Sequence, residues 1–214
     1  MDQQPRPGVC AKKGARNRLI RWAESNPEWV LGFQDECWWS RISEPLLHAW
    51  CPENEPLRLL EKAQEAPKGE PKALACYGLL RADRGEMRLR FADGRPVSAL
   101  TEAYLAWVCQ VLEAEGKRAL LLIWDNAPWH TSGRVRAWIR AHNRQVKRSG
   151  RGVRLVVCWL PTKSPWLNNI EPKWIHGKRA VAEPGRVLAS EELVERVFTY
   201  YGCARTPHLS NPVP

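Results

Sequence analysis

A run of six apolar residues, Ala119–Trp124, constrains the fold of this chain more than any other feature of its sequence. No polar residue interrupts the run, which is typical of a central strand that other elements cover on both faces. Sheets covered in this way contain parallel strands that are connected by helices. The chain is therefore expected to fold as an α/β protein.

Strand and helix patterns surround this run. Glycine, proline and capping residues separate the periodic segments. Strands are expected at residues 29–34, 38–42, 73–80, 87–91, 119–124 and 153–159, with 38–42 pairing antiparallel to 29–34, and helices at 18–26, 98–115, 132–148, from 168 onward and at 190–201. Antiparallel strands followed by alternating helices and strands predict a mixed five-stranded sheet with helices on both faces.

One compact domain is expected at residues 18–203, because a chain of 214 residues can bury one substantial core. Residues 1–17, rich in proline, glycine and lysine, are expected to form a flexible basic leader, and residues 204–214 a loose tail. Residues 43–71 are rich in proline and glutamate and are expected to form a surface excursion.

The composition favours a cytoplasmic protein with a polyanionic partner. Lys and Arg number 33 against 23 Asp and Glu, which gives a net charge of +10 and makes nucleic acid the first candidate partner. No apolar stretch is long enough for a membrane span or a signal peptide, so no membrane partner is expected. The seven cysteines include no CxxC pair and are interpreted as reduced thiols.

Positive charge is concentrated between Arg134 and Arg179, where twelve basic residues accompany one acid, Glu171. Three of the arginines recur every fourth residue and are expected to line one face of the helix at 132–148. A solvated charged face is the alternative interpretation. The residues predicted to bind DNA are Arg136, Arg140, Arg144, Lys147, Arg148, Lys163 and Lys173.

Three acids occupy similar places in the predicted elements: Asp35 and Asp125 follow strands, and Glu171 lies in the first turn of a helix. Ends of adjacent strands converge, and carboxylate oxygens are the ligands that Mg²⁺ prefers. Two divalent cations assist phosphoryl transfer by stabilising the attacking and leaving oxygens. The three acids are therefore candidates for a metal-dependent catalytic site.

Each acid also has a structural interpretation. Asp35 is compatible with a turn residue at a strand end, Asp125 with an Asx-turn, and Glu171 with a capping box begun by Asn168. Glu36 follows Asp35 on a strand and is expected to point to the opposite face, so we leave it out of the metal set.

The segments around these acids resemble the catalytic motifs of the mariner-related transposases of the insertion sequence 630 family. The segments are Gly32-Phe-Gln-Asp-Glu36, Leu122-Ile-Trp-Asp-Asn-Ala-Pro-Trp-His130 and Leu160-Pro-Thr-Lys-Ser-Pro-Trp-Leu-Asn-Asn-Ile-Glu-Pro-Lys-Trp174. The resemblance spans about residues 18–179. It implies an RNase H-like fold and a DDE endonuclease that needs two Mg²⁺ or Mn²⁺ ions, held by the catalytic Asp35, Asp125 and Glu171, and that acts on transposon ends and inserts them at TA target DNA.

The resemblance also concerns residues beside the acids. Asn126 and His130 match the family pattern and are expected to contact a phosphate or a metal-bound water, with a core or turn role as the alternative. Of the two tryptophans that bracket Glu171, Trp166 and Trp174, one is a candidate for stacking on an unpaired base.

Two features depart from the family pattern. The second and third acids are 171 − 125 = 46 positions apart, longer than in compact members, and we expect the extra length to form a basic loop at residues 144–154. No helix-turn-helix candidate precedes Asp35, so we expect one part of a split or truncated transposase whose ends are recognised by an upstream helix-turn-helix polypeptide.

These features lead to one expected function and two alternatives. The expectation is a bacterial, nucleoid-associated transposase catalytic domain that cleaves DNA and transfers strands, with a homodimer as one option for its assembly. The first alternative is an RNase H-like nuclease that hydrolyses DNA without strand transfer. The second is a non-catalytic DNA-binding remnant of a transposase.

Overall fold

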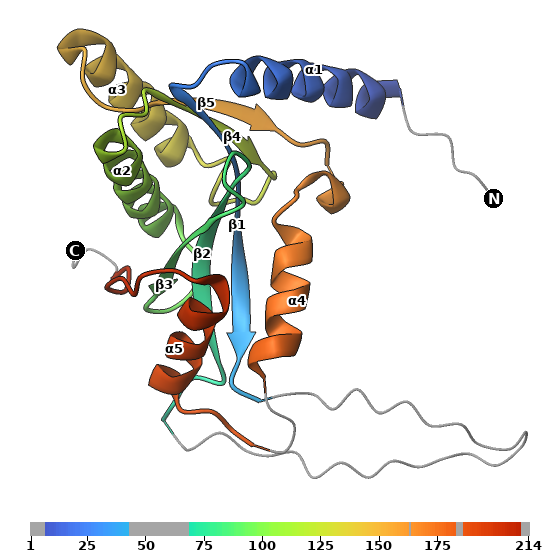
Figure 1. Cartoon of the computed structure of the whole chain (residues 1–214), viewed down its shortest axis with the longest axis vertical. Helices are drawn as coiled ribbons and strands as arrows, with labels where there is room; N and C mark the ends of the chain where they lie inside the picture. The colour runs from blue at the N-terminus through green and yellow to red at the C-terminus, as the bar shows by residue number, and fades with distance from the viewer. Residues whose placement is uncertain (1–6, 43–68, 163, 183–185, 211–214) are drawn as a thin grey trace, which may run out of the picture.

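The computed structural model describes residues 7–42, 69–162, 164–182 and 186–210, and within them five strands form one sheet (Figure 1). The strand order is β3-β2-β1-β4-β5. Strand β1 pairs antiparallel with β2 and β2 with β3, whereas β1 and β4, and β4 and β5, are parallel. The strands are β1 (Trp29–Ser40), β2 (Ala73–Arg81), β3 (Met87–Ala92), β4 (Ala119–Trp124) and β5 (Arg154–Trp159). The predicted mixed five-stranded sheet is confirmed.

Helices cover both faces of this sheet (Figure 1). One face packs against α1, α4 and α5, and the other against α2 and α3. The helices are α1 (Pro7–Glu24), α2 (Ser98–Ala114), α3 (Gly133–Ser149), α4 (Glu171–Val181) and α5 (Ser190–Tyr201), with a 3-10 turn, η1, at Pro165–Leu167.

Strand β4, the apolar run Ala119–Trp124, lies at the centre of both layers. Leu121 and Ile123 of β4 belong to the core under α1, α4 and α5, and Leu120, Leu122 and Trp124 to the core under α2 and α3. Every residue of β4 is buried. A fully buried leucine contributes about 1.5 to 3 kcal/mol of hydrophobic free energy. The leucines of this strand therefore contribute substantially to the stability of the fold.

Strand β1 corrects the prediction of two antiparallel strands at 29–34 and 38–42. It is one continuous strand of 12 residues, and Asp35 therefore lies inside it and is not a turn residue. Only the segment from Trp29 to Phe33 pairs with β4, while Gly32 to Ser40 pairs with β2. Cys37 and Trp39 are both buried, so the side chains of β1 still alternate between the two faces of the sheet beyond Asp35. The nine residues of β2 provide a pairing partner for this second part of β1.

The predicted limits of the compact region also need correction. Helix α1 begins at Pro7 and not at Arg18, and it packs on the sheet through Ala23, with Leu19 and Ile20 beside it. The end of the described chain is not loose either. Leu209 is buried, its N–H donates to Phe91 at 2.7 Å, and it accepts from the Asp93 N–H at 2.9 Å. Strand β3 is an edge strand whose free backbone groups this segment satisfies.

Helix α3 accounts for most of the residues that were expected to form a basic loop. Ser132 caps its start by accepting from the Val135 N–H at 3.2 Å, and Gly150, in the left-handed conformation, ends it. The connection to β5 is therefore only residues 150–153. The predicted excursion at 43–71 lies almost entirely outside the described residues.

Among the described helices, none is both long and apolar enough to cross a membrane.

Candidate active site

A pocket of about 300 Å³ opens where β4 and β5 end and α4 begins. Loops that follow two neighbouring parallel strands meet there, which is where open α/β sheets commonly place their sites. Its lining residues come from the second and third motifs: Asp125, Asn126, Ala127, Leu160, Pro161, Thr162, Ser164, Asn168 and Glu171. The Asn126 side chain joins these motifs by donating to the Leu160 carbonyl at 2.7 Å.

Asp35 lies on the face of β1 that α4 covers. The indole Nε1 of Trp174 donates to its Oδ2 at 3.2 Å. Gly78, the β2 residue directly opposite Asp35, makes this contact possible, because a Cβ there would lie 2.3 Å from the Trp174 ring. Burial, and then the charges of Glu36 and Glu171, raise the pKa of Asp35 well above its usual value.

Asp125 follows β4 and is held through one of its two oxygens. Oδ1 accepts from the Ala127 N–H at 3.1 Å and contacts His130 Nδ1 at 2.6 Å. The first of these contacts is the predicted Asx-turn. Burial alone would raise the pKa of Asp125, but the hydrogen bond and positive charge of His130 lower it below the usual value. With its side chain 45% exposed, Asp125 also faces the pocket.

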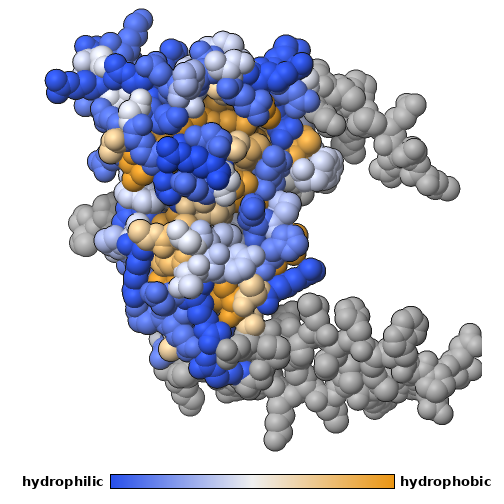
Figure 2. Space-filling view, viewed as in Figure 1, coloured by the Kyte–Doolittle hydropathy of each residue, from blue (hydrophilic) through white to orange (hydrophobic). Residues whose placement is uncertain are grey.

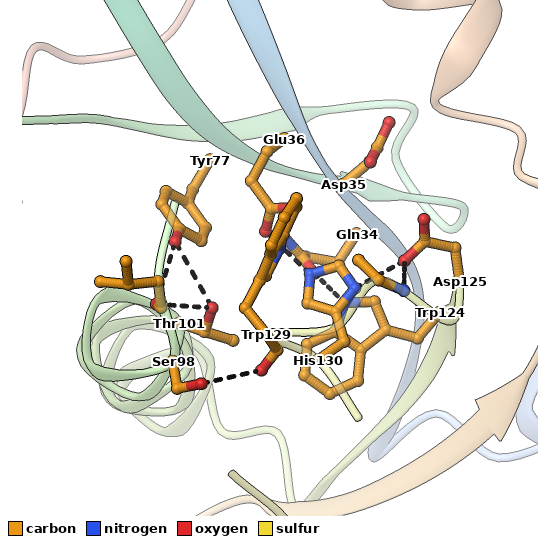
Figure 3. A network of polar contacts seen from close by, with 12 residues as sticks. Gln34, Asp35, Glu36, Tyr77, Ser98, Thr101, Trp124, Asp125, Trp129 and His130 are labelled. Carbon is orange, nitrogen blue, oxygen red and sulfur yellow. Dashed lines mark hydrogen bonds and ion pairs between the residues drawn. The ribbon is translucent and has the colours of Figure 1, made fainter. Parts of the chain in front are cut away.

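His130 lies between two carboxylates, as Figure 3 shows. Its Nε2 contacts Glu36 Oε1 at 2.9 Å, and its ring stacks on Trp124 with 4.2 Å between centroids. Burial alone would lower the pKa of His130, but Glu36 and Asp125 raise it to about 9. Both ring nitrogens therefore donate at neutral pH. Glu36 and Asp35 extend to opposite sides of β1 (Figure 3), as predicted.

Glu171 is the first residue of α4 and is partly exposed. Burial, and then the charge of Asp125, raise its pKa. The alternative capping box is not formed, because no side chain caps α4. Asn168 instead donates its Nδ2 to the Gln34 carbonyl at 3.2 Å. Its Oδ1 is buried and has no hydrogen-bond partner among the described residues.

The chemistry of these donors suits a divalent cation. Asp125 and Glu171 both raise the pKa of Asp35, and Asp125 raises that of Glu171, so the three carboxylates repel one another. An acceptor without a donor, Asn168 Oδ1, is buried at the same pocket. A cation would relieve both. Within the described ranges, however, no three His, Cys, Asp or Glu side chains are grouped closely enough to hold an ion. The three carboxylates therefore do not form a complete set of metal ligands in this structure.

The residues predicted to bind DNA lie mainly on α3. Arg136, Arg140, Arg144, Lys147 and Arg148 are all exposed, and Figure 2 shows hydrophilic residues over the end of the molecule where α3 lies. Arg136 lies over the ring of Trp159, at 5.9 Å from its centroid. Lys173 is exposed on α4, and Lys163 lies outside the described residues.

Sequence reasoning missed three contributors to the site: Glu36, Trp174 and Asn168. Glu36 was placed on the correct face, but nothing in the sequence indicated that His130 would meet it there. The sequence makes Trp174 a candidate for base stacking only, but it is buried, whereas Trp166 is 71% exposed. The spacing of three residues from Glu171 to Trp174 puts both on the same side of a helix, which is the one signal that pointed to Trp174.

Comparison with known proteins identifies the relatives of this chain. A family described as DDE superfamily endonuclease matches residues 30–194, a range that includes all three acids. No curated protein matches the chain.

Solved structures of Mos1 transposase share the fold. The paired-end complex with the left transposon end superposes with a TM-score of 0.63 at 15% identity, over 95% of this chain and 57% of that one. For the paired-end complex with Mn the values are 0.62, 16%, 94% and 56%, and for the isolated mariner catalytic domain 0.56, 14%, 96% and 85%. These matches establish an RNase H-like fold. This chain spans little more than half of the Mos1 chains in the DNA complexes.

Proposed function

Since the chain belongs to the DDE superfamily endonucleases, we propose that it is the catalytic part of a DNA transposase of the insertion sequence 630 type. Its catalytic residues would be Asp35, Asp125 and Glu171. The observation that carries the proposal is electrostatic: beside a pocket lined by Asp125 and Glu171, the charges of these two acids raise the pKa of Asp35, and the charge of Asp125 also raises the pKa of Glu171. Perturbed pKa values of this kind cluster at functional sites.

The proposed reaction has two steps. In the first, a water oxygen attacks a phosphorus at the transposon end, the P–O3′ bond breaks, and a 3′-hydroxyl and a 5′-phosphate result. In the second, that 3′-hydroxyl oxygen attacks a phosphorus of target DNA at a TA step, and the broken target bond leaves its own 3′-hydroxyl. In each step an attacking oxygen forms a bond to phosphorus and a 3′ oxygen leaves it.

Asp35, Asp125 and Glu171 would hold two Mg²⁺ or Mn²⁺ ions. When bound, these ions would supply charge stabilisation for the attacking and leaving oxygens. The remaining residues have distinct tasks: Trp174 and His130 orient Asp35 and Asp125, and the exposed arginines of α3 hold the DNA backbone. The Mos1 paired-end complexes with Mn and with Mg support this choice of metals.

DNA is the proposed partner, both as transposon end and as target. Structures of Mos1 with a left transposon end and of its strand transfer complex support it. Arginines of α3 contact phosphates and carry little sequence information. We therefore propose that a helix-turn-helix polypeptide recognises the end sequence, and that two catalytic chains act together on paired ends.

The test is a strand-transfer assay with the full chain. A labelled duplex that mimics a pre-cut end with a free 3′-hydroxyl is incubated with a supercoiled plasmid and Mg²⁺ or Mn²⁺. The expected result is label joined covalently to the plasmid at TA steps, and its loss when EDTA removes the metal.

The alternatives give different results in the same assay. A nuclease without strand transfer would nick the plasmid in a metal-dependent manner but leave the label unjoined. A DNA-binding remnant would shift the duplex in a gel and produce neither product. Glu113→Gln, which changes an exposed acid on α2, serves as a matched control and should behave as wild type.

A further inference from the structure

Glu36 is a buried acid to which the proposed chemistry gives no role. Its side chain is only 5% exposed, and it lies on the face of β1 opposite to Asp35 (Figure 3). Removing a carboxylate from water costs several kcal/mol unless charge and hydrogen bonds compensate it. The burial of Glu36 on the strand that carries Asp35 therefore indicates a role for this carboxylate.

Three side chains compensate the buried carboxylate, and each comes from a catalytic motif. His130 Nε2 contacts Oε1 at 2.9 Å, Gln34 Nε2 donates to the same oxygen at 2.9 Å, and Trp129 Nε1 donates to Oε2 at 2.8 Å. Both carboxylate oxygens are thus engaged, and Glu36 is fixed in one orientation.

His130 connects Glu36 to Asp125 and so restrains the orientation of the Asp125 carboxylate. Its ring is buried, stacked on Trp124 and bonded through both nitrogens, to Glu36 on one side and to Asp125 Oδ1 on the other. A ring held at both nitrogens and on one face cannot rotate without breaking a contact. Because Oδ1 of Asp125 takes these contacts, Oδ2 is the oxygen that the geometry directs toward a ligand in the pocket.

We propose that Glu36 is a positioning residue for the metal-binding carboxylate of Asp125 and that it acts through His130. The arrangement extends by one residue the sites in which an outer group fixes a metal-binding carboxylate or histidine by a hydrogen bond, where loss of the outer group weakens metal binding about 10- to 100-fold. It rests on the proposed function in one respect, namely that Asp125 binds the cation.

A purely structural role for Glu36 would have a different signature. Breaking a buried ion pair lowers the free energy of unfolding wherever the pair lies, but only a positioning residue changes the affinity for a metal. Glu115 offers the matched control. It is a partly buried acid that pairs with Arg81 and Arg88, and it belongs to a separate network at the end of α2.

The experiment measures Mn²⁺ binding to the full chain without DNA, by electron paramagnetic resonance titration, together with the thermal midpoint. Glu36→Gln keeps the shape of the side chain and should weaken Mn²⁺ binding by about 10- to 100-fold. Glu115→Gln should lower the thermal midpoint and leave Mn²⁺ affinity within twofold of wild type. Trp129→Phe, which removes one donor to Glu36 and no charge, should weaken Mn²⁺ binding less than Glu36→Gln and covers the case in which the latter does not fold.

A double mutant tests the route through His130. If Glu36 acts only through that ring, Glu36→Gln should add almost nothing to the loss of affinity caused by His130→Gln. Additive losses would overturn the route, and unchanged Mn²⁺ affinity in Glu36→Gln or, should that variant not fold, in Trp129→Phe would overturn the positioning role while leaving the proposed function intact. Wild type that binds no Mn²⁺ at all would overturn the proposed function, and the positioning role with it.

Discussion

Asp35 and Asp125 come from adjacent parallel strands, yet the two faces of the sheet hold them in opposite ways. Asp35 is on the α4 face, where the neutral indole Nε1 of Trp174 donates to it and burial raises its pKa. Asp125 is bonded to His130, which anchors in the core under α2 and α3 and lowers its pKa. The folded protein therefore resists a negative charge at Asp35 and supports one at Asp125.

This difference separates two requirements of a metal site. A ligand that is already ionised and oriented, such as Asp125, can receive a cation without reorganisation. A ligand whose charge is disfavoured, such as Asp35, makes the cation itself part of the stability of the fold. The contrast predicts effects that differ in sign as well as in size.

The largest expected effect is on catalysis, where the two aspartates should behave alike. Asp35→Asn, Asp125→Asn and Glu171→Gln each keep the shape and remove a ligand charge. Each should lower metal-dependent cleavage on the order of 10³-fold, equivalent to about 4 kcal/mol of transition-state stabilisation. Single-turnover cleavage of a transposon-end duplex in Mg²⁺ and in Mn²⁺ measures this. Full activity in any one variant would exclude that acid from the site.

The next effect concerns DNA, and it should be confined to the face of the sheet that carries α3. Changing Arg136, Arg140 and Arg144 together to Gln should reduce the slope of log K against log salt by up to about 2.7, at about 0.9 per phosphate contact. A labelled duplex titrated at several salt concentrations gives both slopes. Three exposed arginines elsewhere, Arg84, Arg95 and Arg118, provide the control. Equal slopes for both triple variants would identify the α3 residues as a solvated face.

The third prediction tests the sign of the contrast directly, in protein without metal at neutral pH. The raised pKa of Asp35 means that its ionisation costs stability as pH rises, so Asp35→Asn should raise the thermal midpoint. The lowered pKa of Asp125 means that its charge stabilises the fold above its usual pKa and that this contribution is lost as pH falls. Asp125→Asn should therefore lower the free energy of unfolding by about 1 to 3 kcal/mol, and with it the midpoint, since it leaves the buried His130 without its charged partner.

Calorimetry of the two variants decides this third prediction, with roughly 2 to 4 °C of midpoint per kcal/mol for a chain of this size. Added Mg²⁺ should raise the midpoint of wild type by mass action and that of Asp35→Asn much less. Shifts in the same direction for both variants would show that the two faces hold their aspartates in the same way.

The same two faces show how far a sequence can predict this fold and this site. The apolar run at Ala119–Trp124 predicted a central strand covered on both faces, and the order of the elements around it predicted the mixed sheet. Local periodicity did not predict the length of β1. Residues 29–40 form one strand because β2, which lies more than thirty residues later in the sequence, is long enough to pair with its second part. Local periodicity failed again at Leu209, which is ordered by the free edge of β3.

Motifs located the three acids, but they did not predict what holds them. The bond from Trp174 to Asp35 depends on Gly78, which leaves space for the indole, and Gly78 carries no chemistry that a motif search would notice. The contact of His130 with Glu36 joins residues 94 positions apart. Both are products of packing and become visible only in three dimensions.

The smallest expected effect distinguishes the two tryptophans that bracket Glu171. Trp174 is buried against Asp35, so only Trp166, 71% exposed on η1, is free to stack on a base. The turn that carries it is anchored by the buried Leu167, whose N–H donates to the Ser164 carbonyl at 3.1 Å. Its backbone is thus fixed before DNA arrives, which reduces the entropy lost on binding.

Trp166→Ala should therefore weaken binding of a DNA end with an unpaired overhang by about 1 kcal/mol, the lower part of the range for one base on an aromatic ring. Binding of a blunt duplex should not change, because its bases are already stacked. Trp38→Ala, an exposed tryptophan near the far end of β1, is the control and should affect neither. Fluorescence anisotropy with the two duplexes measures the difference. An equal loss on blunt and overhanging ends would mean that Trp166 contacts backbone and not a base, and no loss on either would remove it from the DNA path.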